Sequence, residues 1–123
     1  MRPVTIVETA PFIRATAPLL SDEERLALID HLARNPTAGA VIPDTGGARK
    51  LRWGRGASGK SGGIRTIYYF HDPDFPLFLL TAYGKGSKAN LTAAERSSIR
   101  EAIGRLKQKI LVSRARGLAG QAS

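Results

Sequence analysis

Apolar residues recur at helical spacing in two stretches of the first third of the chain. Pro11 to Leu20 predicts a short helix, with Pro11 in its first turn, where a proline is tolerated. Ser21 and Glu24 then form a capping box, which opens a second helix that ends before Asn35-Pro36. The predicted core face of this second helix is Leu26, Ile29, Leu32 and Ala33.

A third helical pattern lies in the last third of the chain. Thr92 and Glu95 form a second capping box, and the helix that it opens is expected to run to about Ser113. The apolar stripe of this helix is Ile99, Ala102, Ile103, Leu106 and Ile110. Residues 114–123 are rich in Gly, Ala and Ser, which predicts a flexible C-terminal tail after a single domain spanning residues 1–113.

Alternating and β-branched patterns predict four strands. They are Val4 to Glu8, Arg49 to Trp53, Gly63 to Phe70 and Leu77 to Tyr83, and the tract 37–47 is loop-like because of its Gly and Pro residues. The last three strands have connections too short for helical crossovers, so these neighbours should be antiparallel. The sequence thus predicts an α+β domain of order β-α-α-β-β-β-α, with a small antiparallel-rich sheet and helices packed on one of its faces.

Basic residues are concentrated in the later part of the chain. The 123 residues include 19 Lys and Arg against 10 Asp and Glu, which gives a formal net charge of +9. Residues 1–48 contain 4 basic and 6 acidic residues, whereas residues 49–123 contain 15 basic and 4 acidic ones. So uneven a charge favours a polyanionic partner, most often a nucleic acid.

Composition also removes several classes of protein. With no cysteine, the chain has no disulfide scaffold, no Cys-ligated zinc and no thiol catalysis. No apolar run is long enough to span a membrane and the N-terminus lacks a secretion-signal pattern, so we expect a cytoplasmic protein with no membrane partner. His31 and His71 lack companions at metal-ligand spacing, which predicts no metal site; His71 is a weak candidate for a general acid or base.

One motif suggests nucleotide binding, but its context argues against that function. Residues Gly54 to Ser61 read GRGASGKS and fit the phosphate-binding pattern G-x-x-x-x-G-K-[ST]. The pattern works when a helix follows directly, because the helix N-terminus binds the phosphate. Gly62-Gly63 and a predicted strand follow here. We therefore interpret the segment as a basic hairpin loop, with Arg55 and Lys60 facing solvent or RNA.

The basic residues of the predicted sheet form a more specific pattern. Lys50 and Arg52 are two positions apart, so their side chains point to the same side of one strand. Arg65 lies on the next strand, and Lys85 comes two positions after Tyr83 on the last. Three adjacent strands could bring the four cations to one surface. Ordinary outward-facing charge on a half-exposed sheet would give the same pattern, and both interpretations stay open.

Several ordered motifs together resemble the RelE/HigB toxins of bacterial type II toxin–antitoxin systems. The resemblance spans residues 4–110, nearly the whole domain. The motifs are Asn35-Pro36 with Ala38-Gly39, Thr45-Gly46-Gly47 with Arg49-Lys50-x-Arg52, Lys60-x-Gly62-Gly63-x-Arg65 with Tyr68-Tyr69, and Tyr83-x-Lys85 with Lys88. The resemblance implies a compact RelE-like α+β fold and an mRNA interferase that cleaves messages in the ribosomal A site.

The resemblance also implies residue roles and partners. Lys50, Arg52, Arg65 and Lys85 would be the catalytic basic residues, and Arg49, Arg55, Lys60, Tyr83 and Lys88 would bind RNA. The nucleophile would be the 2′-OH of the RNA, with no metal and no cofactor. Lys50 or Lys85 could remove its proton only in neutral form, which repulsion between neighbouring cations would favour. The implied partners are mRNA, the ribosome and a cognate antitoxin, expected to be a helix-turn-helix DNA-binding protein.

One departure from the family pattern leaves the base open, and two other functions compete. Some members have a tyrosine after the last strand as a candidate base, whereas this chain has Leu91 near that place, and Tyr83 is the nearest tyrosine. A ParE-like toxin that binds DNA gyrase is one alternative, although such relatives lack the catalytic basic set. A non-catalytic RNA-binding module is the other; the aromatics of GIRTIYYF would then stack on bases, but core packing is their commoner use.

Overall fold

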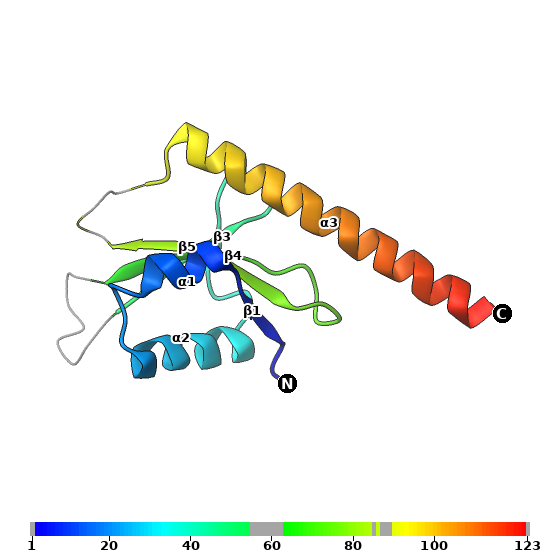
Figure 1. The fold of residues 1–123 in the computed structure, drawn as a ribbon, viewed down its shortest axis with the longest axis horizontal. Helices are drawn as coiled ribbons and strands as arrows, with labels where there is room; N and C mark the ends of the chain where they lie inside the picture. The colour runs from blue at the N-terminus through cyan, green and yellow to red at the C-terminus, as the bar shows by residue number, and fades with distance from the viewer. Residues whose placement is uncertain (1, 55–62, 85, 87–89, 123) are drawn as a thin grey trace.

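A computed structural model of the chain describes residues 2–54, 63–84, 86 and 90–122 (Figure 1). Within these residues there are three helices and one five-stranded sheet, which confirms the predicted α+β class. In chain order the elements are β1 (Ile6–Glu8), α1 (Ala10–Thr16), α2 (Asp22–Arg34), β2 (Ala40–Val41), β3 (Arg49–Trp53), β4 (Ile64–Tyr69), β5 (Leu77–Gly84) and α3 (Ala93–Ala122).

The sheet has the order β1-β5-β4-β3-β2. The predicted antiparallel pairing of β3 with β4 and of β4 with β5 is confirmed. Two features were not predicted: β1 pairs with β5 in parallel, and the tract expected to be a loop contributes β2, whose Ala40 and Val41 pair with Lys50 and Arg49. The two-residue strand is too short to leave a periodic signal in the sequence.

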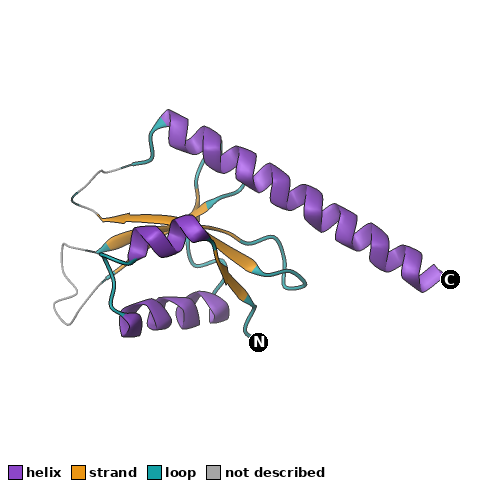
Figure 2. Ribbon diagram, viewed as in Figure 1, coloured by secondary structure: helices purple, strands orange, loops and turns teal. Residues whose placement is uncertain are grey.

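Helices cover both faces of the sheet, so the prediction that they pack on one face is wrong (Figure 2). One core contains Phe12 of α1 and Leu28 and Leu32 of α2, packed with Ile64 and Tyr68 of β4. A second core lies under α3 and contains Ile67, Tyr69 and Tyr83 of the sheet with Ile99, Ile103 and Ile110 of the helix. The physical reason is visible in β4, whose side chains are apolar on both faces, so that each face needs a covering layer.

Both capping boxes form as predicted. Ser21 accepts a hydrogen bond from the Glu24 N–H while the Glu24 side chain accepts one from the Ser21 N–H, and Thr92 and Glu95 make the same exchange before α3. The predicted face of α2 is partly wrong, because Leu26 is 58% exposed and Leu28 is fully buried instead. The predicted end of the last helix is also wrong, since α3 continues from Ser113 to Ala122. Residues 114–122 include no proline, and Ala, Arg, Leu and Gln favour the helical state.

Candidate nucleic-acid interface

Three of the predicted catalytic residues lie on adjacent strands. Arg52 of β3 is the register partner of Arg65 of β4, and Arg65 is in turn the partner of Tyr83 of β5. Lys50 lies two positions before Arg52 on β3 and is paired with Ile67. Lys50, Arg52 and Arg65 are hereafter called the basic row.

Alternation along the strands assigns the basic row to the α3 side of the sheet. Leu51 and Trp53 pack against the core formed with α1 and α2, so Lys50 and Arg52 between and beside them project to the opposite face. Ile67 lies two positions after Arg65 on β4 and belongs to the core under α3, which gives Arg65 the same face. The three described cations therefore share one side of the sheet, a placement that the sequence had left open.

The guanidinium group of Arg65 has an unusual environment. Its Nη1 atom is buried and has no hydrogen-bond partner among the described residues. Within the same part of the chain, no salt bridge involves Lys50, Arg52 or Arg65. A buried nitrogen without an acceptor costs stability, and so do like charges directly opposite on neighbouring strands. An anion bound at this position would remove both costs.

Lys50 has one contact across the chain that the sequence did not indicate. Its Nζ donates to the Oδ1 of Asn90 at 3.5 Å, at the outer limit of hydrogen-bond length. Asn90 comes two residues before the Thr92 cap of α3, so the start of that helix meets the basic row. Forty positions separate the two residues, and no local spacing in the sequence could have paired them.

Tyr83 and Leu91 lie in the core under α3. Tyr83 is 6% exposed and Leu91 is 7% exposed. Leu91 is thus an apolar residue that packs in this core. Tyr83 is next to Arg65 through the strand pairing, so it is the described tyrosine that adjoins the basic row.

Of the other five predicted residues, Arg49 does not join the basic row, and four lie outside the described part of the chain. Arg49 projects to the other face, where its Nη1 donates to the carbonyl of Gly39 at 2.7 Å and, more weakly, to that of Thr37 at 3.4 Å. These hydrogen bonds hold the segment before β2 against β3, so Arg49 has a structural role. The other four, Arg55, Lys60, Lys85 and Lys88, lie outside the described residues, as does most of the GRGASGKS motif. A strand, β4, follows that motif, as predicted.

His71 lies at the opposite end of β4 from Arg65. Its Nδ1 is 2.8 Å from the Tyr69 hydroxyl, and its ring meets Phe75 edge-on. Burial raises the pKa of Tyr69, and the nearby Asp72 carboxylate raises it further. His71 is therefore part of a cluster with aromatic neighbours, and it is remote from the cations that it would have to assist.

Asp72 joins this cluster to α3. Its carboxylate forms an ion pair with Arg114, whose guanidinium also stacks on Phe75 at 4.9 Å from the ring centroid. Burial opposes ionisation of Asp72, but hydrogen bonds from the Asp74 N–H and from Arg114 outweigh it and lower its pKa. The pair holds the later turns of α3 against the β4–β5 connection.

Both histidines contact aromatic side chains. In the described part of the chain, no group of three His, Asp or Glu side chains is arranged to hold a metal ion. His31 instead lies against Trp53, with the ring centroids 5.1 Å apart. This contact couples α2 to the end of β3.

Part of the motif set that carries the family resemblance has a structural role. The Gly39 N–H donates to the Tyr68 hydroxyl at 2.8 Å, and an added Cβ at Gly39 would lie 2.9 Å from both Tyr68 and the Lys50 carbonyl. Burial raises the pKa of Tyr68, although the Gly39 bond and the charge of Arg49 act in the opposite direction. Glycine is required at this position because the two chain segments approach so closely.

Thr45-Gly46-Gly47 forms the turn between β2 and β3. The buried Thr45 hydroxyl donates to the Ile42 carbonyl at 2.7 Å and accepts from the Ala48 N–H at 3.0 Å. Gly46 and Gly47 have φ values of 79° and 114°, which glycine adopts without strain. Arg100 of α3 donates to the Asp44 carbonyl at 2.7 Å and ties the turn to the helix. These motif residues therefore fix the hairpin that presents Lys50 and Arg52.

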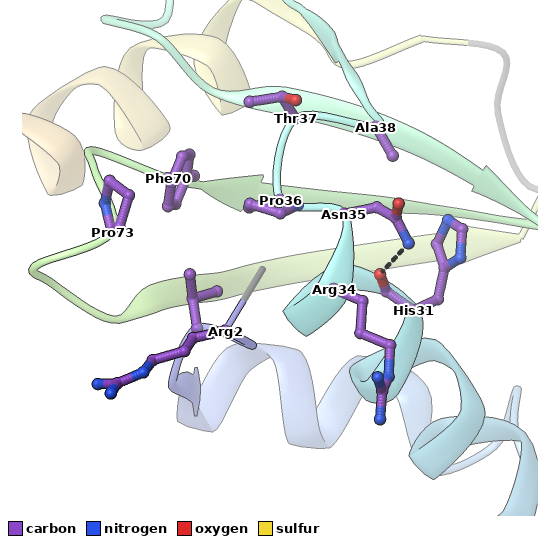
Figure 3. Close-up of a pocket in the computed structure, with 10 residues that line it drawn as sticks. Arg2, His31, Arg34, Asn35, Pro36, Thr37, Ala38, Phe70 and Pro73 are labelled. Carbon is purple, nitrogen blue, oxygen red and sulfur yellow. Dashed lines mark hydrogen bonds between the residues drawn. The ribbon is translucent and has the colours of Figure 1, made fainter.

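A pocket of about 430 Å³ lies on the other side of the sheet (Figure 3). Pro36, Phe70 and Pro73 provide much of its apolar lining, and Asn35 donates to the His31 carbonyl at its edge. No residue of the basic row lines it. The pocket and the predicted site are therefore separate places on the molecule.

No protein-family model matches the chain. In the described part of the chain, none of the helices has the combination of length and apolar character that crossing a membrane needs.

Proposed function

We propose that the chain is a RelE/HigB-type toxin, an endoribonuclease that cleaves mRNA in the ribosomal A site and so inhibits translation. The observation that supports this most is the pairing of Arg52 with Arg65 on one face of the sheet, where the buried Nη1 of Arg65 has no acceptor among the described residues. A phosphodiester supplies the missing acceptor and the missing negative charge.

Arg65 would stabilise the transition state. Its planar fork can bind two phosphate oxygens at once, and Arg52 on the neighbouring strand would add a second cation. As the 2′-oxygen attacks, charge accumulates on the non-bridging oxygens, where fixed donors act most strongly. Removal of one such donor from an enzyme typically slows catalysis by about 10²–10³-fold.

The reaction needs only groups of the RNA and the side chains around it. The bond from the 2′-oxygen to phosphorus forms, the bond from phosphorus to the 5′-oxygen breaks, and the products are a cyclic phosphate and a free 5′-hydroxyl. One proton leaves the 2′-OH and one reaches the departing oxygen. Lys50, which contacts Asn90, is the described candidate to move a proton, with Lys85 expected beyond the last strand; Tyr83 is the register partner of Arg65 but lies in the core under α3.

The proposal includes three partners: mRNA, the ribosome and an antitoxin of the helix-turn-helix class. An acidic segment of the antitoxin would complement the basic row, because no acidic side chain of the described residues forms an ion pair with it. Covering the row would block the phosphate from reaching Arg65.

The test is to map new mRNA 5′ ends in a translating bacterial extract. Four proteins are compared: wild type, Arg65→Ala, Arg65→Lys and the control Arg14→Ala, which removes an exposed cation from α1. We expect in-frame cuts from the wild type and the control, a loss of about 10²–10³-fold for Arg65→Ala and a partial loss for Arg65→Lys, which keeps the charge without the fork. A chelator should leave the cuts in place.

Two outcomes would count against this function. Near-normal mRNA cleavage by Arg65→Ala would show that Arg65 does not stabilise the transition state. Intact messages in the presence of a folded wild-type chain would favour gyrase inhibition or simple RNA binding, and a supercoiling assay with purified gyrase separates these two.

A further inference from the structure

Every charged residue of α3 after Glu101 is basic. No Asp or Glu follows Glu101 in the sequence, whereas Arg105, Lys107, Lys109, Arg114 and Arg116 all do. Two of these cations are used inside the fold: Lys107 lies over the Tyr69 ring, 5.9 Å from its centroid, and Arg114 pairs with Asp72. Arg105, Lys109 and Arg116 have no salt bridge in the described part of the chain.

These three cations lie along one stripe of the helix that faces away from the sheet. Their spacings of four and seven residues place them on the same side of α3, opposite the turns that bury Ile103 and Ile110. All three are exposed. With Gln108, Val112 and Ser113 they line one shallow concavity of about 530 Å³. These six residues are called the α3 stripe.

We infer that the α3 stripe binds the phosphate backbone of structured RNA, as a docking surface separate from the basic row. The inference rests on the proposed function for its choice of RNA, and it adds a second contact to that function. At 1.5 Å per residue the cations lie about 6 Å and about 10 Å apart along the helix, so each can meet a different phosphate of a nucleic-acid strand. Gln108 and Ser113 add uncharged donors between them.

The position of the stripe makes it suitable for a part of the RNA that is not being cut. The helix start meets the basic row through Asn90, and Arg105 to Arg116 lie about 20 to 36 Å further along the axis from Thr92. Figure 1 shows the C-terminal turns of α3 extending past the edge of the sheet. When a message is held at the basic row, the α3 stripe would thus remain available to bind a neighbouring RNA duplex.

Charge and apolar content favour RNA over the other occupants of such a surface. A second copy of the chain would bring two basic helices together, which repulsion opposes. Val112, 40% exposed, is the single apolar residue of the stripe, so little surface is available for burial in a lipid layer.

The experiment measures binding to a duplex RNA whose riboses are 2′-O-methylated. Such a duplex cannot be cut through the 2′-oxygen, so the result does not depend on nuclease activity. The stripe variant combines Arg105→Gln, Lys109→Gln and Arg116→Gln. The control combines Arg2→Gln, Arg14→Gln and Arg34→Gln, which removes the same charge from exposed positions outside α3 and the sheet. Circular dichroism checks that both variants keep their helices.

We expect the stripe variant to bind the duplex at least about tenfold more weakly than the control, with a salt-dependence slope smaller by about 2 to 3. Equal losses in the two variants would overturn the inference, because binding would then follow net charge alone. The inference would also be overturned if the stripe variant lost binding to anionic lipid vesicles but bound the duplex as well as the control does. That result would indicate that the α3 stripe binds a membrane surface. If the wild type cuts no mRNA but the stripe variant binds the duplex more weakly than the control, the proposed nuclease activity is wrong and the RNA-binding role of the α3 stripe still holds.

Discussion

Arg52 and Arg65 are register partners on β3 and β4, so two guanidinium groups project from adjacent strands onto the same face of the sheet. Such an arrangement is unfavourable in a protein that binds nothing, because like charges directly opposite repel each other. The buried Nη1 of Arg65 adds the cost of a donor without an acceptor in the described structure. Violations of this kind are concentrated at functional sites.

This relationship predicts an anion-dependent stability. Inorganic phosphate should raise the melting temperature of the wild type, since a ligand bound only by the folded chain stabilises it by about 2.7 kcal/mol at a hundredfold excess over Kd. Arg65→Gln should lose this phosphate response and should be no less stable than the wild type in phosphate-free buffer. Arg14→Gln, with the same change of charge, should keep the response. Equal phosphate responses in the two variants, read by thermal unfolding, would contradict the assignment.

Gly39→Ala should destabilise the fold by about 1–3 kcal/mol, because its Cβ would lie 2.9 Å from the Lys50 carbonyl and from the Tyr68 ring and hydroxyl. The measurement is the free energy of unfolding in urea. Gly104→Ala serves as the matched control: its Cβ would meet nothing within 4 Å, and alanine in a helix interior should gain about 0.5–1 kcal/mol. A neutral Gly39→Ala would mean that β3 and the segment before β2 can separate at no cost.

The ion pair between Asp72 and Arg114 predicts a loss of stability in acid. The pKa of Asp72 is lower in the folded chain than its usual value of about 3.9, so its contribution is present above that value and disappears as the pH falls through the folded pKa. Asp72→Asn should therefore lower the melting temperature at pH near 7 and make no difference in strong acid. Melting curves of both proteins across this range test it. Asp30→Asn, in the exposed pair with Arg34, should have a smaller effect at neutral pH.

The cap of α3 provides a further prediction. Thr92 accepts the Glu95 N–H at 3.1 Å, and Thr92→Ala should cost about 1 kcal/mol of unfolding free energy. If the cap also fixes Asn90 beside Lys50, the variant should slow mRNA cleavage by more than its stability loss explains. Ser98→Ala, within the same helix and exposed, should leave both quantities nearly unchanged. Cleavage rates at a temperature where all three proteins are fully folded separate the two effects.

Local signals predicted most of the elements. The two capping boxes and the strands from Arg49, Ile64 and Leu77 depend on residues close in the chain, and they form as expected. The pattern predicts Leu26 on the core face because two faces of α2 carry apolar residues, and only the packing of Leu28 and Leu32 against Phe12 decides between them. The sequence predicts a helix end near Ser113 because Gly, Ala and Ser are common after it, whereas Arg114 holds that turn of α3 to Asp72 and Phe75.

In the candidate site, too, some features follow from the local sequence and others from the tertiary structure. The spacing of Lys50 and Arg52 determined that they share one side of a strand, since successive residues alternate across any sheet. The sequence by itself also determined the basic character of the later part of the chain. The register of β3 against β4 is a tertiary property, and it alone made Arg65 the partner of Arg52.

Three other features also depend on the tertiary structure. Arg49 donates to a backbone carbonyl, and Asn90 lies beside Lys50 although forty positions separate them. Strand β1 pairs with β5 in parallel. The physical reason is that these outcomes depend on which buried faces cover one another. That choice is made by the whole core, whereas capping and alternation are decided within a few residues.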